Sequence, residues 1–222
     1  EPWNQQAVFQ GIGVPVITDY QIWNDNPEKV FGFTREWTET NPNTTNAVIK
    51  ALILAGQWLD AEDENGVLIN RPEAVQILAQ SNYVGAPAEV IANSMTGFFE
   101  YEKGDKRDQS EFNIFFRKFA TFPFYSDCIW YLTQMRRWGQ IPTPRPDGFY
   151  DAIARKVYQP TLYLQAAEEL VAEGLVKEAD IPFGSDGYRA PTNKFLDGVT
   201  YDGRKPNDYL NSLTIGLKGE SV

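Results

Sequence analysis

The sequence predicts an α/β protein that is rich in helices and has few strands, all early in the chain. After residue 41 the apolar residues mostly recur at the i, i+3, i+4 spacing of helices. The runs that combine glycine with β-branched residues are short and fall before residue 34. A hydrophobic share of 42% can fill a sizeable core. A sheet of two or three strands closes poorly alone, so we expect further strands from sequence before Glu1.

The first elements alternate strand and turn signals. Gly11–Thr18 has the glycine and β-branched residues of a short strand, and Pro15 places it at a sheet edge or a strand start. Asn24–Pro27 is typical of a turn, and Val30–Phe33 is typical of a buried strand. We expect a polar helix around Trp37 to follow.

A long amphipathic helix is predicted next. Asn41 is expected to cap it, with Pro42 at its first position. One buried stripe is predicted along this helix from the helical spacing of seven apolar residues, Ala47, Val48, Ala51, Leu52, Ala55, Trp58 and Leu59.

The middle of the chain is predicted to be helical and interrupted. Asn70 and Glu73 resemble a capping box, and Pro87 is expected to open another helix. The charged run within residues 98–108 is expected to be a solvated loop. The phenylalanine-rich segment 112–124 can form an aromatic wall facing a ligand, but core packing is the favoured interpretation.

The last third begins with a predicted helix over Ser126–Trp138 that ends at Gly139. Three prolines within residues 142–146 predict a stiff linker. One or two helices follow over Gly148–Gly174, bent at Pro160. The tail has no clear period, and we expect an irregular strap anchored by Phe183, Tyr188, Phe195, Tyr201 and Tyr209.

Composition excludes several functions. A net charge of −10 argues against binding to nucleic acid or anionic lipid. The absence of histidine removes Ser-His-Asp and Cys-His catalysis and most zinc sites. Nucleotide-binding and hydrolase motifs are also missing. The sequence therefore predicts a protein that is not an enzyme and uses no cofactor or metal. Cys128, the single cysteine, is expected to be a buried apolar residue.

Two features of the sequence bear on the location of the protein: its apolar runs and its N-terminus. The sequence contains no run of about 18 apolar residues, which is the length needed to span a membrane. The start, EPWNQQ, is not a signal peptide and lacks Met, so we expect a processed or excised segment.

Three groups of charged residues are candidate sites. A carboxylate cluster could hold a cation, although a solvated acidic turn is favoured; it comprises Asp60, Glu62, Asp63 and Glu64. The pair Arg136-Arg137 could grip an anion, or could complement the C-terminal end of a helix. Lys29 stands beside a predicted strand end, where its ammonium could donate to a small anion; a plain surface lysine is the alternative.

Several motifs resemble those of one receptor family. Residues 1–60 and later segments are similar to the nitrate-binding and bicarbonate-binding receptors of cyanobacterial ABC importers. The motifs that carry the likeness are Glu1-Pro2-Trp3-Asn4, Ile22-Trp23, Asn26-Pro27-Glu28-Lys29-Val30, Phe33 ahead of Asn41-Pro42, Trp130, Arg136-Arg137-Trp138-Gly139 and Asp208-Tyr209-Leu210-Asn211-Ser212-Leu213.

The resemblance implies a fold. It is the two-lobed clamshell of the periplasmic binding protein type II kind, of which this chain resembles the C-terminal half. On this interpretation residues 1–40 complete the second ligand-binding lobe. Residues 41–222 return to pack on the first lobe, mostly helical with the irregular C-terminal strap. Part of the pocket, including a histidine, is expected from sequence before Glu1.

The resemblance also implies a ligand site. Lys29 matches the lysine that contacts nitrate in the nitrate receptors, and Glu1 borders the pocket as a second candidate. Bicarbonate receptors are expected to place a carboxylate there and to use calcium, so Lys29 favours nitrate, although Glu28 is adjacent. A lysine with neutral donors can compensate the charge of nitrate in a closed cleft.

The implied function is a receptor that captures nitrate, or nitrite, and delivers it to the permease of an ABC importer. Such a receptor is periplasmic and is held at the outer face of the inner membrane by an anchor outside this chain. Two alternatives stay open. One is a bicarbonate receptor of the same family, and the other is a cytoplasmic receptor-like regulatory domain fused to an importer ATPase.

Overall fold

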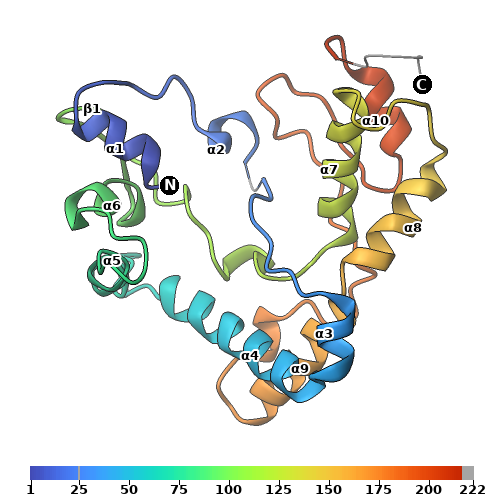
Figure 1. Cartoon of the computed structure of the whole chain (residues 1–222), viewed down its shortest axis with the longest axis horizontal. Helices are drawn as coiled ribbons and strands as arrows, with labels where there is room; N and C mark the ends of the chain where they lie inside the picture. Colours follow the sequence, from blue (N-terminus) through green and yellow to red (C-terminus); the bar gives the residue numbers. More distant parts are fainter. Residues whose placement is uncertain (25, 217–222) are drawn as a thin grey trace. The chain divides into compact units, whose positions relative to one another are not determined.

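Helices are the main regular secondary structure of the described residues. The computed structural model describes residues 1–24 and 26–216, so the predicted turn at Asn24–Pro27 and the end of the strap lie partly outside the described residues. The α-helices are α1 (Trp3–Phe9), α2 (Asp19–Ile22), α3 (Arg35–Thr40), α4 (Pro42–Leu59), α5 (Arg71–Leu78), α6 (Ala88–Met95), α7 (Tyr125–Arg137), α8 (Asp147–Val157), α9 (Pro160–Ala172) and α10 (Pro206–Ser212) (Figure 1). Short 3-10 turns occupy Arg117–Phe119 and Glu178–Asp180.

The strands lie elsewhere than predicted. Gly11–Thr18 and Val30–Phe33 have no strand structure, and Val30 and Phe31 are 66% and 62% exposed. A strand needs a neighbour with which to pair its backbone groups. Within the described residues neither segment has one, so the prediction of strands there was wrong for this structure.

A hairpin forms where a solvated loop was predicted. β1 (Phe98–Glu102) pairs antiparallel with β2 (Asp105–Asp108), and Gly104 has a φ of +91° in the turn between them. Phe99 and Tyr101 are buried, so β1 is held by packing as well as by backbone hydrogen bonds. The strand with its buried aromatic face was not predicted, because charged residues dominate this run. The helix-rich class with few strands is nevertheless confirmed.

The chain divides into two compact units. The first consists of Glu1–Ile22 and Ala51–Thr121, and the second of Trp23–Lys50 and Phe122–Val222. Within the described residues no helix is long and apolar enough to cross a membrane.

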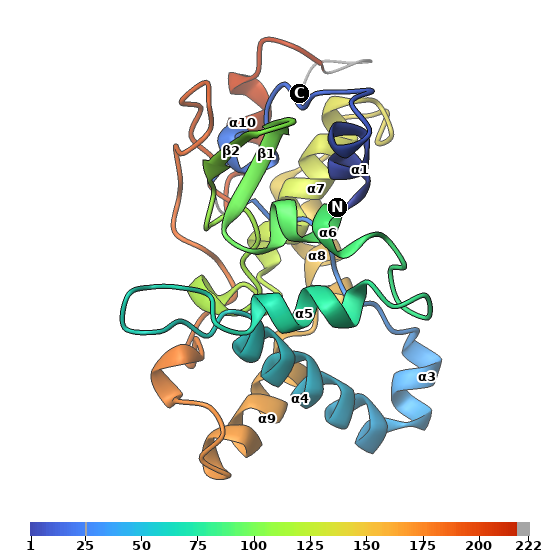
Figure 2. The same ribbon diagram turned by 90° about the vertical axis from the view of Figure 1, so that its left-hand side faces the viewer.

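In the first unit, α5 and α6 pack against each other, and α1 and α6 pack on β1 (Figure 2). The core there consists of Ala74, Val75, Ala86, Ile91 and Met95. α5 begins directly after Asn70 as predicted, but Asn70 makes no capping bond. Its Nδ2 instead donates to the carbonyl oxygen of Trp58 at 2.8 Å. α6 follows Pro87 as expected, and its Ile91 and Met95 belong to this core.

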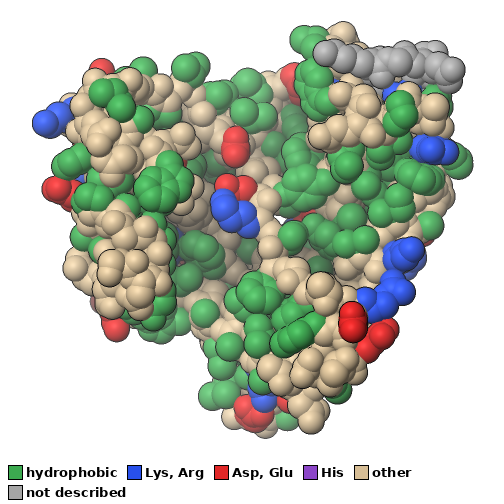
Figure 3. Space-filling model, viewed as in Figure 1, with side chains coloured by type: hydrophobic (Ala, Val, Ile, Leu, Met, Phe, Trp, Pro, Cys, Tyr) green, Lys and Arg blue, Asp and Glu red, His purple; other side chains and the backbone are tan. Residues whose placement is uncertain are grey.

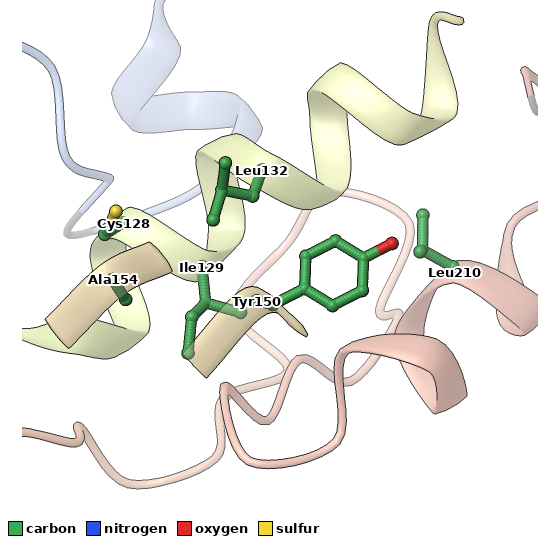
Figure 4. Packing of buried hydrophobic residues seen from close by; sticks show 6 residues of the cluster. All are labelled: Cys128, Ile129, Leu132, Tyr150, Ala154 and Leu210. Atoms are coloured by element: carbon green, nitrogen blue, oxygen red, sulfur yellow. The ribbon is translucent and has the colours of Figure 1, made fainter. Parts of the chain in front are cut away.

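In the second unit, α7, α8 and α10 pack together (Figure 1). Their shared core contains Cys128, Ile129, Leu132, Tyr150, Ala154 and Leu210 (Figure 4). Cys128 is buried as predicted, and burial raises the pKa of its thiol to about 11. α7 ends just before Gly139, whose φ of +82° suits glycine. The helical structure is interrupted between α8 and α9, just before Pro160, where the sequence predicted a bend.

The predicted strap is largely irregular between residues 181 and 205. Two of its aromatic residues, Tyr201 and Tyr209, are buried beside Trp23. The strap lies close to α7 at Gly203, where an added Cβ would stand 2.6 Å from the Cβ of Ser126. Aromatic anchoring of the strap is therefore confirmed for these residues.

The stripe predicted along α4 is wrong. Pro42 begins the helix as expected, but Ala51, Leu52 and Ala55 are exposed, while Ile53 and Gly56 are buried. α4 runs from one compact unit into the other, with the boundary between residues 50 and 51. A periodic stripe predicts one continuous core along a helix, and a helix shared between two units does not have one.

The predicted cap of α4 is also not observed. The side chain of Asn41 donates from Nδ2 to the carbonyl oxygen of Trp37 at 3.0 Å, so it serves the C-terminal end of α3.

Candidate functional site

Lys29 lies on an irregular, exposed segment of the second unit, residues 27–33, between α2 and α3. We refer to residues 27–33 as the Lys29 segment. Trp23 precedes it and is buried, stacked on Phe195 with ring centroids 4.6 Å apart and tilted against Trp130 at 5.0 Å. After the segment, the Thr34 hydroxyl accepts from the backbone N–H of Trp37 at 3.2 Å and caps α3. The segment is therefore anchored at both of its ends.

A tyrosine of α7 also holds the Lys29 segment near its start, at Glu28. The hydroxyl of Tyr131 donates to the backbone carbonyl of Glu28, with an O···O distance of 2.7 Å. The two residues are 103 positions apart in the sequence. In the described part of the chain this is the one hydrogen bond that joins the segment to another element of the fold.

The ammonium of Lys29 is accessible. Its side chain is 74% exposed, and Nζ lies 2.5 Å from Oε1 of Glu28, which is 59% exposed. An ion pair between exposed side chains contributes at most about 1 kcal/mol, so an incoming anion can compete for the lysine. The arrangement offers one positive charge and up to three N–H donors on a braced backbone.

Apolar and aromatic side chains follow this lysine in the sequence and continue into α3. Phe31 packs on Phe33 with ring centroids 5.0 Å apart, and Phe33 stacks on Trp37 at 5.0 Å. Val30 and Phe31 are among the exposed large hydrophobic residues of the chain, and apolar side chains form a large part of the face seen in Figure 3. A cation beside apolar side chains suits an anion that gives up its hydration water easily.

Glu1, the second predicted site residue, lies in the first unit. One carboxylate oxygen accepts from the backbone N–H of Gln5 at 3.2 Å, which places the charge at the N-terminal end of α1. Gln5 is fully buried and donates to the carbonyl oxygen of Glu100 at 2.9 Å. In this structure Glu1 thus supports the start of a helix. Lys29 and Glu1 belong to different compact units.

The pair Arg136-Arg137, also a candidate for anion binding, has a structural role. The Arg136 side chain is fully buried, and its Nη1 donates to the carbonyl oxygens of Ile141 and Pro142 at 3.4 Å. Arg137 donates from Nε to the carbonyl oxygen of Ile215 at 2.8 Å. Both guanidinium groups therefore bind backbone carbonyls that follow the helix or lie in the tail. The interpretation of this pair as helix-terminal cations is favoured over an anion grip.

Asp60 differs from the predicted solvated turn. Its carboxylate and the guanidinium of Arg71 each have a side chain only 1% exposed, and they lie 2.7 Å apart. The other carboxylate oxygen accepts from the backbone N–H groups of Phe115, Phe116 and Arg117. Burial lowers the pKa of Arg71, and the hydrogen bond to Asp60 opposes that shift. Asp60 is a buried tie between distant segments.

The remaining acidic residues of this turn do not form a cation site. Glu62 pairs with Arg117 at 2.5 Å, and Asp63 accepts from the backbone N–H groups of Asn65 and Val67. Within the described residues no cluster of three or more metal-ligating side chains occurs.

A small groove lies between α5 and α6 in the first unit, with a volume of about 260 Å³. Its lining is mainly apolar and contains neither predicted ligand residue; it comprises Pro72, Val75, Gln76, Ala88, Glu89, Ala92 and Thr96. The groove offers little to orient an anion.

Comparisons with known proteins support the resemblance seen in the sequence. Residues 1–79 match the NMT1-like family. The chain is 33% identical, over 97% of its length, to the nitrate/nitrite binding protein of Nostoc sp.. It is also 33% identical to the nitrate import ATP-binding protein of Synechocystis sp., and 28% identical to the bicarbonate-binding protein of Synechococcus elongatus, each over 97% of its length.

A solved structure confirms the fold class. The crystal structure of the periplasmic nitrate-binding protein from Synechocystis PCC 6803 matches this chain with a TM-score of 0.83 and 32% identity, over 97% of this chain and 52% of that one. The chain therefore has the fold of part of a periplasmic binding protein.

The matches cover only part of each relative. This chain corresponds to 46% of the Nostoc and Synechococcus binding proteins and to 29% of the ATP-binding protein. It therefore spans about half the length of the binding proteins that it resembles.

Proposed function

We propose that this chain, which is homologous over 97% of its length to cyanobacterial nitrate-binding proteins, is the C-terminal half of a solute-binding receptor that captures nitrate for an ABC importer. One observation within the chain carries the proposal. Lys29, at the position expected of a nitrate-binding lysine, is accessible on a segment that Tyr131 holds at Glu28 and that Trp23 and the cap of α3 anchor on either side.

The chemistry of Lys29 suits a small monovalent anion. Nitrate has three oxygens in one plane and no proton to donate, so its partners have to be donors or cations. The Lys29 ammonium supplies both a charge and donors, and neutral N–H groups elsewhere in the pocket complete the shell. Closure of two lobes around the anion would exclude water and strengthen these contacts. Nitrite, with the same charge and two oxygens, is a second ligand of the proposed site.

The lobes of the proposed receptor divide the chain at other positions than the two compact units do. We propose that residues 1–40 complete the second ligand-binding lobe and that residues 41–222 return to the first lobe. Glu1 then borders the ligand from the start of α1, where its carboxylate already supports the helix. Binding shifts the population of the receptor toward its closed state, because the ligand contacts both lobes only there.

The proposed partners follow from the class of protein. The receptor hands nitrate to the permease subunits of an importer whose ATPase energises transport. Its proposed location is the periplasm, and an anchor outside this chain holds it at the outer face of the inner membrane. The similarity to proteins named as binding proteins supports a role without catalysis.

One alternative is a regulatory domain fused to an importer ATPase. The identity of 33% to the nitrate import ATP-binding protein equals that to the Nostoc binding protein, and this equality favours keeping the alternative. The proposed ligand site is the same in both cases. A polypeptide in which this chain follows a nucleotide-binding domain would favour the regulatory role, and one with a secretion signal would favour the receptor.

Calorimetric titration of the full-length protein that contains this chain tests the proposal. We expect nitrate to bind, and we expect Lys29→Glu to abolish binding while leaving the fold intact, because a carboxylate then faces the anion. Lys156→Glu is the matched control, since Lys156 is an exposed lysine of the same unit in the last turn of α8. Equal nitrate affinity in the Lys29 variant would contradict the site, and binding of bicarbonate in place of nitrate would favour the bicarbonate receptor.

A further inference from the structure

We infer that Tyr131 of α7 is a positioning residue that sets the reach of Lys29 toward the anion. The inference rests on the proposed function, since it concerns the geometry of the same site. Tyr131 is not expected to touch the ligand. It acts through the carbonyl group of Glu28, one peptide unit before Lys29.

Aromatic packing supports the later part of the Lys29 segment, from Phe31 onward, but not the backbone at Glu28 and Lys29. Val30 and Phe31 are exposed, and the segment pairs with no strand in the described part of the chain. Trp23 fixes the approach to the segment by packing, and Thr34 fixes its exit by capping α3. Within the described residues, no backbone-to-backbone hydrogen bond fixes the positions of Glu28 and Lys29.

The contact between Tyr131 and Glu28 has the geometry of a normal hydrogen bond. The O···O distance of 2.7 Å is the usual value for a hydroxyl that donates to a carbonyl. The Tyr131 ring also packs edge-on against Trp130, with centroids 5.3 Å apart. Trp130 in turn contacts Trp23. Trp130 therefore packs against both Trp23, which precedes the Lys29 segment, and Tyr131, which holds the segment at Glu28.

A contact that positions the backbone matters because the lysine side chain is flexible. A lysine side chain has four rotatable bonds, and its ammonium can meet an anion only if the backbone presents it at the correct distance. A displacement of about 1 Å at the backbone weakens a charged hydrogen bond substantially. Fixing the peptide group before Lys29 therefore lowers the cost of ordering the lysine when nitrate binds.

The experiment compares Tyr131→Phe with the wild type in the full-length protein. The substitution keeps the ring and its contact with Trp130 and removes only the hydroxyl donor. We expect nitrate affinity to fall about three- to tenfold, which is the range for loss of one hydrogen bond. Tyr83→Phe is the matched control, because Tyr83 is an exposed tyrosine of the other unit.

A second readout reports position without any ligand. Trypsin cleaves after lysine, so the rate of cleavage between Lys29 and Val30 measures how readily the segment leaves its place. We expect Tyr131→Phe to accelerate this cut and Tyr83→Phe to leave it unchanged. A third readout is a double-mutant cycle with Lys29→Gln, in which loss of the tyrosine hydroxyl should no longer weaken residual nitrate binding.

The outcomes separate this inference from the proposed function. If the wild type binds nitrate but Tyr131→Phe changes neither affinity nor cleavage, the positioning role is wrong and the receptor stands. If affinity falls equally with Lys29→Gln in place, Tyr131 does not act through Lys29 and the inference is overturned. If the wild type binds no nitrate, the proposed function fails and the inference fails with it.

Discussion

At the scale of the residue, the proposed site contains a group that competes with the ligand for Lys29. The carboxylate of Glu28 lies 2.5 Å from the ammonium of Lys29. An anion that binds to Lys29 has to displace this carboxylate or share the lysine with it, and it then stands near a second negative charge. The same residue also accepts the hydrogen bond from Tyr131, but through its backbone carbonyl. The two roles of Glu28 can therefore be separated by changing its side chain.

We predict that Glu28→Gln tightens nitrate binding by about two- to fivefold, the range for removal of one exposed charge interaction. The backbone contact with Tyr131 stays, and the lysine gains freedom to meet the ligand. Calorimetry of the full-length protein at low ionic strength measures the change, and added salt should reduce it. Glu39→Gln removes a charge from an exposed position in α3 and serves as the control. Weaker binding in Glu28→Gln would mean that Glu28 helps to hold the lysine in place.

At the scale of the element, helices were predicted well where local signals define their ends. α6 begins after Pro87 and α7 ends near Gly139, as predicted, and the bend predicted at Pro160 is the break between α8 and α9. Proline and glycine act through their own backbone geometry, so their effect can be read locally. Strands depend on partners distant in the chain. The hairpin β1–β2 was therefore missed, and Gly11–Thr18 was assigned a strand structure that it does not have here.

The same reasoning explains what the sequence could tell about the site. Lys29 was proposed as a site residue from a motif of adjacent residues, and the structure shows only that it is accessible. Tyr131 was missed, because it lies 103 positions from Glu28 and nothing in its helix marks it. Asp60 was misjudged, because its neighbours in sequence are acidic and exposed, whereas its partners, Arg71 and the backbone at 115–117, are brought to it by the fold.

Asp60 gives the strongest prediction about stability. It joins the end of α4 to the start of α5 and to the loop before α7, and both it and Arg71 are almost completely buried. We expect Asp60→Asn to lower the free energy of unfolding by about 3–5 kcal/mol, since it leaves a buried guanidinium without a counter-charge. Denaturant unfolding followed by circular dichroism measures the loss.

Glu64→Gln is the control for this prediction. Glu64 lies in the same acidic turn and is exposed, so its loss should change stability by less than about 0.5 kcal/mol. Equal stability of the two variants would show that hydrogen bonds alone, without the charge of Asp60, hold these elements together.

At the scale of the whole molecule, each compact unit leaves apolar residues in solvent. In the first unit Ile12, Val14 and Val16 are 76%, 63% and 94% exposed, and in the second unit Val30 and Phe31 are similarly exposed. Apolar surface gains about 25 cal/mol per Å² when it is removed from water. The chain spans about half of the binding proteins that it resembles. We propose that the other half of the receptor covers these residues and shares the ligand with Lys29.

The last prediction concerns the 222-residue chain taken alone. If the other half of the receptor supplies donors to the anion, each missing charged or neutral hydrogen bond weakens binding, and the isolated chain should bind nitrate more than about tenfold less tightly than the full-length protein. Its exposed apolar residues should also bind a hydrophobic dye such as ANS, and the full-length protein should bind far less of it. Circular dichroism has to show folded helices in both samples for the comparison to hold. Equal nitrate affinity of the two proteins would place the complete site within this chain, because no donor outside it would then contribute to the free energy of binding.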